Sequence, residues 1–469
     1  MLPTFQDFEK YKAENRVDEF ISNAITQHQL DSMTEEAFIA DAYDHQRNIT
    51  INEYVQVMYT LAGSPVEDFT ASNNKIASNF FHRLNTQRCT YSLGNGLSFQ
   101  DESIKDALGK DFDNKLYDLG YKSLIHGLCF GFWNVDKLYV FPLTEFVPFW
   151  DEYDGTLKAG IRYWRLASDK PITAVLYEID GYTRYHSSEE SNDKSTAFVV
   201  EQEKLPYKLR VAHTEVNGSE VVGAENYSSL PIVPMWGSKL HQSTLVGMRE
   251  AIDSYDLIRS GFANDLTDCS QIYWIISNCG GMTDEDLARV RDRLKINHIA
   301  SADEGDIHPH THDIPYEARK QYLDDIRSGM YEDFGGLDVH VITAGATNDH
   351  IDAAYQPLDE NADDFEYNVI EFVRQVLTFI GKDEVPTFKR NRVSNQTEQT
   401  NMVLSAASYL DTRTVLNKLP FITPDEVEEI QKRVDAEGME KMSLSETPKE
   451  PTEEAAEETP AIEGSPFEQ

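Results

Sequence analysis

Residues 243–269 read STLVGMREAIDSYDLIRSGFANDLTDC, and this stretch decides how the rest of the chain is interpreted. Its apolar residues recur every three or four positions, which is the period of one stripe along an α-helix. The stripe consists of Leu245, Met248, Ile252, Tyr255, Ile258, Phe262 and Leu266. Charged residues occupy the other faces, and Ser243 is a residue type that favours a helix start. At 1.5 Å per residue, the pattern predicts a helix of roughly 40 Å.

A second stripe of the same kind lies at residues 317–334, where two glycines, Gly335 and Gly336, follow as a stop signal. Its members are Tyr322, Ile326, Met330 and Phe334. Two long amphipathic helices separated by a compact insert indicate a stalk with a small domain at its tip. Periodicity alone leaves a second interpretation equally open, in which both are ordinary core helices.

The composition is that of a folded protein, with 40% hydrophobic and 11% aromatic residues over 469 positions. This length predicts two to four domains. No apolar run approaches the roughly 18 residues that span a bilayer, and the start MLPTFQDFEKYKAEN lacks a secretory pattern, which predicts a cytoplasmic protein without membrane contact. The cysteines, Cys89, Cys129, Cys269 and Cys279, show no C-x-x-C spacing, so we expect free buried thiols.

The charge is strongly negative, with 42 basic against 81 acidic residues and a formal net charge of -39. A surface of this sign repels phosphate, which argues against tight binding of nucleic acid through counterion release. A path along which DNA slides without sticking is compatible with the same surface. An acidic coat that only confers solubility explains the charge equally well.

The order of elements predicts an α+β fold. Helices are expected at residues 1–70, 73–84 and 113–126, and aromatic and β-branched segments from Cys129 to about residue 216 predict antiparallel strands. The segment 229–236, with Pro231 and Pro234, is expected to be extended. The insert 271–314 begins with a buried strand, QIYWIIS, continues as a short helix at 283–294 and then becomes polar.

The last third of the chain is predominantly helical by pattern. A β-like segment at 338–343 and a small-residue loop, AGATND, precede a helix at about 361–380. Further helices are expected at 395–410, 412–419 and 424–437, the last with Thr423 as cap and Pro424 at its first position. Residues 443–469 are acidic and rich in Ser, Thr, Pro and Ala, which predicts disorder.

Candidate chemistry is sparse, because the phosphate-binding loop, the dinucleotide fingerprint and the nucleophile elbow are all missing from the sequence. The sharpest candidate is His308-Pro-His310-Thr-His312, whose alternating imidazoles would share one face of a strand and could bind Zn²⁺. A metal-dependent hydrolase that uses these histidines is therefore the alternative function. Solvated loop histidines are the simpler interpretation, and no cofactor is expected.

One dense basic spot occurs at residues 389–392. Lys389, Arg390 and Arg392 could contact a phosphate group. In a chain this acidic, the same side chains could equally pair with neighbouring carboxylates, and the sequence leaves both interpretations open.

The sequence resembles the portal proteins of tailed bacteriophages, specifically the long-tailed siphovirus type, over nearly the whole chain to about residue 440. Three local matches carry the resemblance: NNKIASNFFHRLNTQRCTYSLGNG, LPIVPMWGSK followed by EAIDSYDLIRSGFANDL, and PTFKRNRVSNQTEQTNM followed by LDTRTVLNKLPFITPDEVEEI. None of these motifs is catalytic, and it is their order that is specific. The resemblance therefore implies a protein that is not an enzyme.

The resemblance implies a portal-type architecture with an α/β wing, a two-helix stem, a small α/β clip and a helical crown. The implied boundaries are wing 1–240, stem helices 241–270 and 316–336, clip 271–315, a wing return with tunnel loop 337–394, crown 395–440 and a disordered acidic tail 441–469. The stem residues named above, from Leu245 to Phe262 together with Tyr322, Ile326 and Met330, would make the contacts between subunits.

The tunnel loop would lie near residues 343–351, with Thr343, Thr347, Asn348, Asp349 and His350 facing DNA, and residues 382–394 are a competing placement. The family assembles as a homo-oligomeric ring of twelve at one capsid vertex of the virion, after synthesis in the host cytoplasm. Implied partners are the terminase large subunit, then a head-completion adaptor, and the major capsid and scaffolding proteins. Double-stranded DNA would pass through the channel without sequence specificity. An acidic scaffold or adaptor of no fixed ring size is the third hypothesis.

Overall fold

The computed structural model describes residues 2–59, 63–69, 71–187, 198–214, 218–269, 273–276, 283, 285–286, 289, 307–310, 316–341, 348–392, 396–419, 427 and 430–433. The chain divides into two compact units. The larger comprises residues 1–342 and 352–392, and the smaller comprises residues 343–351 and 393–469. The mixed α+β fold class predicted from the sequence is confirmed in the larger unit.

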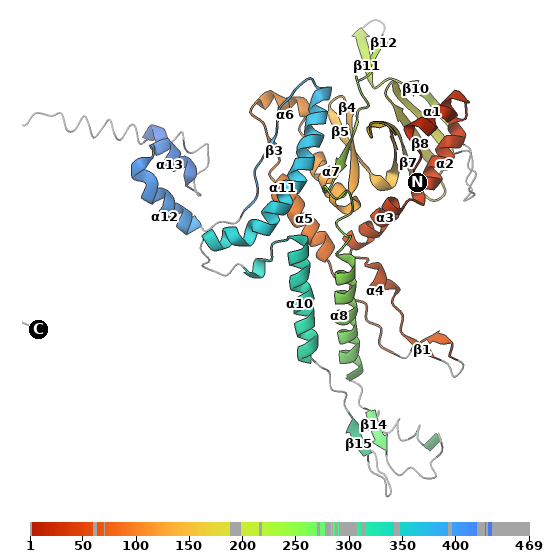
Figure 1. The fold of residues 1–469 in the computed structure, drawn as a ribbon, viewed down its shortest axis with the longest axis vertical. Coiled ribbons are helices and arrows are strands. Elements are labelled where there is room, and N and C mark those ends of the chain that lie inside the picture. Colours follow the sequence, from red (N-terminus) through yellow and green to blue (C-terminus); the bar gives the residue numbers. More distant parts are fainter. Residues whose placement is uncertain are drawn as a thin grey trace, which may run out of the picture. The chain divides into compact units, whose positions relative to one another are not determined.

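The larger unit begins with helices that cover a sheet (Figure 1). The sheet is an antiparallel meander of order β10-β9-β8-β7-β6. Aromatic residues of the first two helices, such as Phe8 and Phe20, pack on Phe149 of the sheet. The elements are α1 (Phe5–Ala13), α2 (Val17–Gln29), α3 (Ser32–Asp44), α4 (Ile49–Glu53), β6 (Phe146–Trp150), β7 (Leu157–Arg165), β8 (Ile172–Glu178), β9 (Gly181–Ser187) and β10 (Phe198–Leu205).

A second, three-stranded sheet of order β13-β4-β5 forms the main core with α7 (Phe112–His126) and α11 (Asn348–Phe379). Gly131 in β4 lies where an added Cβ would meet the ring of Phe372, so glycine permits α11 to pack closely on the strand. The remaining strands and helices of this region are β3 (Leu97–Ser98), β4 (Leu128–Asn134), β5 (Lys137–Pro142), β13 (Ile232–Trp236), β16 (Thr387–Phe388), α5 (Phe80–Leu93), α6 (Glu102–Leu108) and η1 (Leu143–Glu145).

Most strand predictions are confirmed. The strands from residue 128 onward pair antiparallel, and the extended segment with Pro234 is β13, in which this proline lies opposite Phe130 of β4. The run ends later than predicted, because β11 (Lys208–Thr214) pairs with β12 (Gly218–Glu225) as a separate hairpin. Cys89 and Cys129 are free and buried, as expected.

Two long helices follow, α8 (Arg249–Cys269) and α10 (Tyr316–Phe334), and the chain between them contains β14 (Tyr273–Ile276) and β15 (Ile307–His310). After α10, the predicted β-like segment is wrong, because residues there form a 3₁₀ turn, η2 (Val339–Val341). Helix α11 begins well before its predicted start at residue 361. None of the described helices combines the length and apolarity needed to cross a membrane.

The smaller unit is helical where it is described. The predicted helices at 395–410 and 412–419 are confirmed as α12 (Gln396–Ala406), η3 (Ala407–Tyr409) and α13 (Thr412–Lys418). Asp411 caps α13, with its carboxylate accepting the backbone N–H of Thr414 at 3.1 Å. Of the predicted helix at 424–437, residues 427 and 430–433 are helical. The predicted disordered tail lies outside the described residues.

Candidate assembly site

Helices α8 and α10 lie side by side in the larger unit, as the two-stripe pattern predicts (Figure 1). Their contacts run along both helices: the hydroxyls of Ser254 and Tyr322 are 3.3 Å apart, and the ring centroids of Phe262 and Tyr316 are 5.8 Å apart. An ion pair between Asp265 and Arg319 adds a third contact. The described residues thus contain an antiparallel two-helix stem within a single subunit.

Part of the predicted apolar stripe is buried inside the subunit. Leu245, Met248, Ile252 and Met330 are 1–4% exposed and pack with Phe81 and other residues of α3 and α5. The subunit's own helices cover these side chains, and their contact with a neighbouring subunit stays a prediction. Five predicted stem residues keep exposed surface: Tyr255, Ile258, Phe262 and Ile326 are half-buried, and Tyr322 is 46% exposed.

The first stem helix starts six residues later than predicted. Gly247 has a φ of +86°, a left-handed conformation that interrupts a right-handed helix. Ser243 does not cap α8; its hydroxyl donates to the carbonyl of Ile125 at 2.5 Å and accepts the N–H of Leu245 at 3.1 Å. The turn 243–248 therefore fastens the helix start to the end of α7.

A second face of α8, next to the apolar stripe, carries a buried polar seam. Asp256, Ser260 and Asn264 are 0–4% exposed, and each accepts one backbone N–H from the extended segment 74–78. The donors are Ser78 to Asp256 at 2.9 Å, Ile76 to Ser260 at 3.0 Å and Asn74 to Asn264 at 2.6 Å. The acceptors are four residues apart on the helix, which is a rise of about 6 Å. The donors are two residues apart in the extended segment, which is about 6.6 Å, so donors and acceptors stay in register. The seam holds a strand-like segment along the stem helix.

Asp256 also joins the two ends of the chain segment 48–78, which contains α4 and leads to α5. The side-chain amide of Asn48 donates both to Asp256 at 2.5 Å and to the carbonyl of Ser78 at 3.1 Å. Burial raises the pKa of the Asp256 carboxyl, against the hydrogen bonds from Asn48 and Ser78, which favour its ionised form. The sequence pattern places charged residues such as Asp256 only on the faces away from the apolar stripe. The four-residue spacing of the polar residues 256, 260 and 264 is a signal of the seam that sequence reasoning missed.

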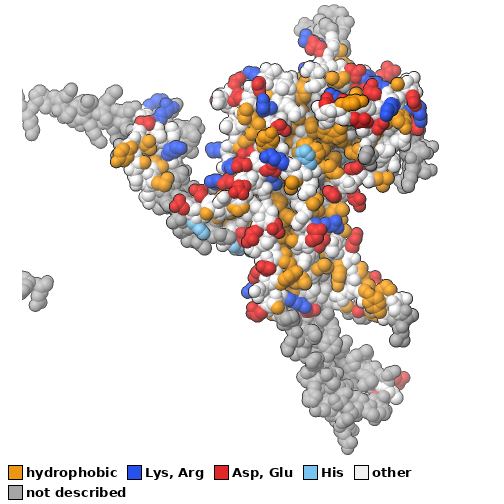
Figure 2. All heavy atoms as spheres, viewed as in Figure 1, with side chains coloured by type: hydrophobic (Ala, Val, Ile, Leu, Met, Phe, Trp, Pro, Cys, Tyr) orange, Lys and Arg blue, Asp and Glu red, His pale blue; other side chains and the backbone are white. Residues whose placement is uncertain are grey.

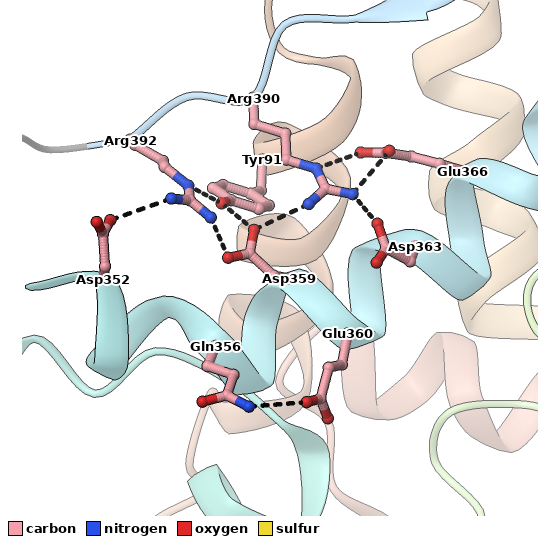
Figure 3. A network of polar contacts seen from close by, with 9 residues as sticks. All are labelled: Tyr91, Asp352, Gln356, Asp359, Glu360, Asp363, Glu366, Arg390 and Arg392. Carbon is pink, nitrogen blue, oxygen red and sulfur yellow. Dashed lines mark hydrogen bonds and ion pairs between the residues drawn. The ribbon is translucent and has the colours of Figure 1, made fainter. Parts of the chain in front are cut away.

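The basic spot at 389–392 is fastened to α11 (Figure 3). The guanidinium of Arg390 donates to both carboxylate oxygens of Glu366, at 3.0 and 2.9 Å, and to Asp359 at 2.9 Å, and it also pairs with Asp363. Arg390 therefore pairs with neighbouring carboxylates, which is one of the two interpretations that the sequence left open.

Arg392 completes this network. It donates to the hydroxyl of Tyr91 at 2.7 Å and to Asp352 at 3.2 Å, and it pairs with Asp359. Burial opposes the ionisation of Asp359, yet Arg392 and Tyr91 hold the pKa of that carboxyl below its ordinary value. For Lys389, whose backbone carbonyl accepts from Asn95 at 2.8 Å, a phosphate contact stays a prediction.

The predicted tunnel-loop residues fall in two groups. Asn348, Asp349 and His350 form the first turn of α11, so their backbone is helical and not a loop. Thr343 and Thr347 lie outside the described residues. In the competing placement, residues 387–388 form β16, which pairs with β3. The DNA-facing position of either segment stays a prediction.

The insert between the stem helices contains a two-stranded antiparallel ribbon. The predicted strand QIYWIIS is confirmed as β14, and β15 is a strand where a polar loop was expected. In its register, His308 lies opposite Ile275 and His310 lies opposite Tyr273, whereas His312 is outside the described residues. Within the described part of the chain, no group of three or more His, Cys, Asp or Glu residues is placed to hold a metal ion.

Comparison with known proteins shows the family of this chain. Residues 23–440 match the family described as "Phage portal protein, SPP1 Gp6-like". A portal protein of Clostridium phage phiCD119 is 24% identical over 437 residues, covering 85% of this chain and 91% of the relative. A portal protein of Bacillus phage SPP1 is 21% identical over 407 residues, covering 79% of this chain and 78% of the relative.

Among solved structures, the chain is similar to one titled "Neck of native GTA particle computed with C12 symmetry", with a TM-score of 0.38, 11% identity, and coverage of 74% of this chain and 90% of that one. The chain belongs to the SPP1-like family of phage portal proteins, which are head-to-tail connectors of the virion.

Proposed function

We propose that the chain forms a closed ring of twelve subunits at one capsid vertex, through which the genome is packaged and later ejected. The terminase large subunit docks on the ring during packaging, and a head-completion adaptor takes its place afterwards. The observation that carries this proposal is the family match, which extends over residues 23–440 and so includes both stem helices.

Two physical features support the proposal. A net charge of -39 per chain gives DNA no deep electrostatic well, which suits a channel through which a genome must slide. The stem also leaves apolar side chains incompletely covered: Ile258 and Phe262 are half-buried, and Tyr322 is exposed. Cyclic rings need such incompletely covered surfaces, because each subunit uses two different patches to contact its neighbours.

Native mass spectrometry of the purified chain, with negative-stain images of the same sample, tests the ring. Twelve subunits of 53.4 kDa each should give a particle of roughly 640 kDa with a central hole, because a cyclic interface closes at a fixed count. A monomer or dimer at every concentration and salt would contradict the proposal.

The DNA path and the terminase contact need a separate measurement. Purified rings should bind short duplex DNA only weakly at physiological salt, since acidic surfaces release few counterions. They should bind purified terminase large subunit through the insert between the stem helices. Loss of terminase binding after replacing residues 270–315 with a short Gly-Ser linker, in rings of unchanged mass, is the expected result, and retained binding would place the contact elsewhere.

A further inference from the structure

The chain between α4 and α5 leaves the subunit as an apolar arm, which we define as residues 54–59 and 63–69. Its strands β1 (Val57–Tyr59) and β2 (Pro65–Glu67) form a two-stranded sheet, so among the described residues they pair only with each other. Figure 2 shows hydrophobic side chains gathered over β1, the strand that Figure 1 labels.

One face of the arm is almost wholly apolar. Alternate residues of a strand share a face, and Val57 lies opposite Glu67 while Tyr59 lies opposite Pro65. The face therefore carries Val55, Val57, Tyr59, Pro65, Glu67 and Phe69. Its apolar side chains are unusually open, with Tyr59 71% and Phe69 83% exposed. A contiguous exposed apolar surface of this kind marks an interaction site.

The arm is held in place at its root. The clasp of Asn48, Ser78 and Asp256 joins the two ends of the segment that carries it, and both ends are bound to α8 through a carboxylate that is fully buried. A hydrogen bond from the side-chain amide of Gln56 to the carbonyl of Ser72, at 3.0 Å, joins the arm to the chain that follows it. The root of the arm is thus bound to α8, while the apolar face itself is exposed.

The stem carries a surface of complementary character, the basic flank, formed by Arg259 and Leu266 of α8 with Lys320 and Leu323 of α10. Arg259 and Leu266 are two helical turns apart, and Lys320 and Leu323 are one turn apart, so each pair shares a face. The contact between Phe262 and Tyr316, which neighbour these pairs on their helices, brings the two faces together.

Charge and exposure of the basic flank match the arm. Arg259 and Lys320 are exposed, and within the described part of the chain neither has an ion-pair partner. Leu266 is 54% exposed and Leu323 half-buried. The flank is therefore an apolar surface with two cations, and the arm face is an apolar surface with one carboxylate, Glu67.

We propose that the arm of one copy docks on the basic flank of the adjacent copy in the ring. This inference rests on the proposed ring and names a surface that closes it. The arm and the flank are different patches of one chain, so the contact is heterologous and repeats around a cyclic assembly. Between copies that each carry a charge of -39, Glu67 beside Arg259 and Lys320 supplies local attraction where the remaining surface repels.

Substitutions on the arm test the contact. Val57→Asp combined with Tyr59→Asp changes only exposed side chains, so the subunit should keep its fold by circular dichroism. Native mass spectrometry should show that the subunit concentration for half-assembly rises at least tenfold. Leu166→Asp, at a residue that is 86% exposed elsewhere on the subunit, is the matched control and should assemble like the wild type.

A charge exchange distinguishes contact between copies from a local effect. Glu67→Arg and Arg259→Glu should each weaken assembly when alone. A 1:1 mixture of the two variants should recover rings with alternating subunits, because every interface in that ring pairs opposite charges at these two positions. A mixture that stays as poorly assembled as its components would overturn the pairing.

The outcomes separate this inference from the function on which it rests. If the wild type forms rings and the arm variant assembles equally well, the arm contact is overturned and the proposed ring stands. Failure of the wild type to form any ring would overturn both. A photo-crosslinker introduced in place of Tyr59 should link to peptides that contain Arg259 or Lys320 of an isotopically labelled copy; linkage within its own subunit would contradict the proposal.

Discussion

At the scale of single residues, His28 is a histidine that folding keeps neutral. It lies on α2 and is fully buried, with its Nδ1 3.0 Å from the hydroxyl of Tyr163 on β7. Burial lowers the pKa of the imidazole to about 4, and the nearby negative charge of Asp31 opposes that shift only in part.

His28 therefore predicts a pH dependence of stability. The unfolded chain binds a proton near pH 6.5 but the folded chain only near pH 4, so the free energy of unfolding should fall as pH drops from about 6.5 to about 4, by up to about 3 kcal/mol. Urea titrations at several pH values measure this slope. His28→Gln should flatten the slope within this window, and an unchanged slope would contradict the assignment.

Asp256 makes a second prediction at this scale. Asp256→Ala leaves the N–H of Ser78 and the amide of Asn48 without their buried acceptor, which should lower the free energy of unfolding by about 2–4 kcal/mol. Hydrogen exchange at Ser78 should accelerate as well. Glu250→Ala, an exposed position on the same helix, should change stability by no more than about 0.5 kcal/mol.

At the scale of elements, helix boundaries depend on contacts that sequence patterns do not report. Residues 73–79 were predicted to be helical, yet the backbone N–H groups of 74, 76 and 78 are bound to side chains of α8, and the helix starts only at Phe80. Helix α11 starts at Asn348 instead of at residue 361, because the helix continues through Pro357. The buried residues Ile351, Tyr355 and Leu358 continue its apolar stripe through the proline.

The arginine network gives a prediction for α11. Arg390→Ala leaves Asp359, Asp363 and Glu366 close together without their shared cation, so like-charge repulsion adds to the lost hydrogen bonds. We expect faster hydrogen exchange in residues 387–392 and a loss of about 1–2 kcal/mol in the free energy of unfolding. Arg390→Lys should recover only part of this, because an ammonium group cannot reproduce the two parallel bonds to Glu366. Wild-type exchange in the alanine variant would contradict the proposed bracing.

At the scale of the whole molecule, charge governs how copies of the chain meet. With a net charge of -39, subunits repel one another unless salt screens them. Raising ionic strength from 0.01 to 0.15 M shortens the Debye length from about 30 to about 8 Å, so assembly should become more favourable. Native mass spectrometry or light scattering at matched subunit concentration measures the shift. Rings that dissociate over this salt range would show that attractive ion pairs outweigh the net repulsion.

Much of this protein could be predicted from its sequence. The two amphipathic stem helices, the antiparallel strands, the extended segment with Pro234 and the resemblance to phage portal proteins all follow from local patterns, because each depends on residues near one another in the chain. The pairing of Arg390 and Arg392 with acids was one of two interpretations that the composition left open.

Only the tertiary structure decided which surfaces these elements use. Periodicity shows that one face of α8 is apolar, but not that Leu245, Met248 and Ile252 are covered by their own subunit. The buried polar seam joins residues that are 178 to 190 positions apart, and the exposed arm depends on that seam for its position. A side chain's partner across such a distance is set by how the elements pack, which no local pattern in the sequence specifies.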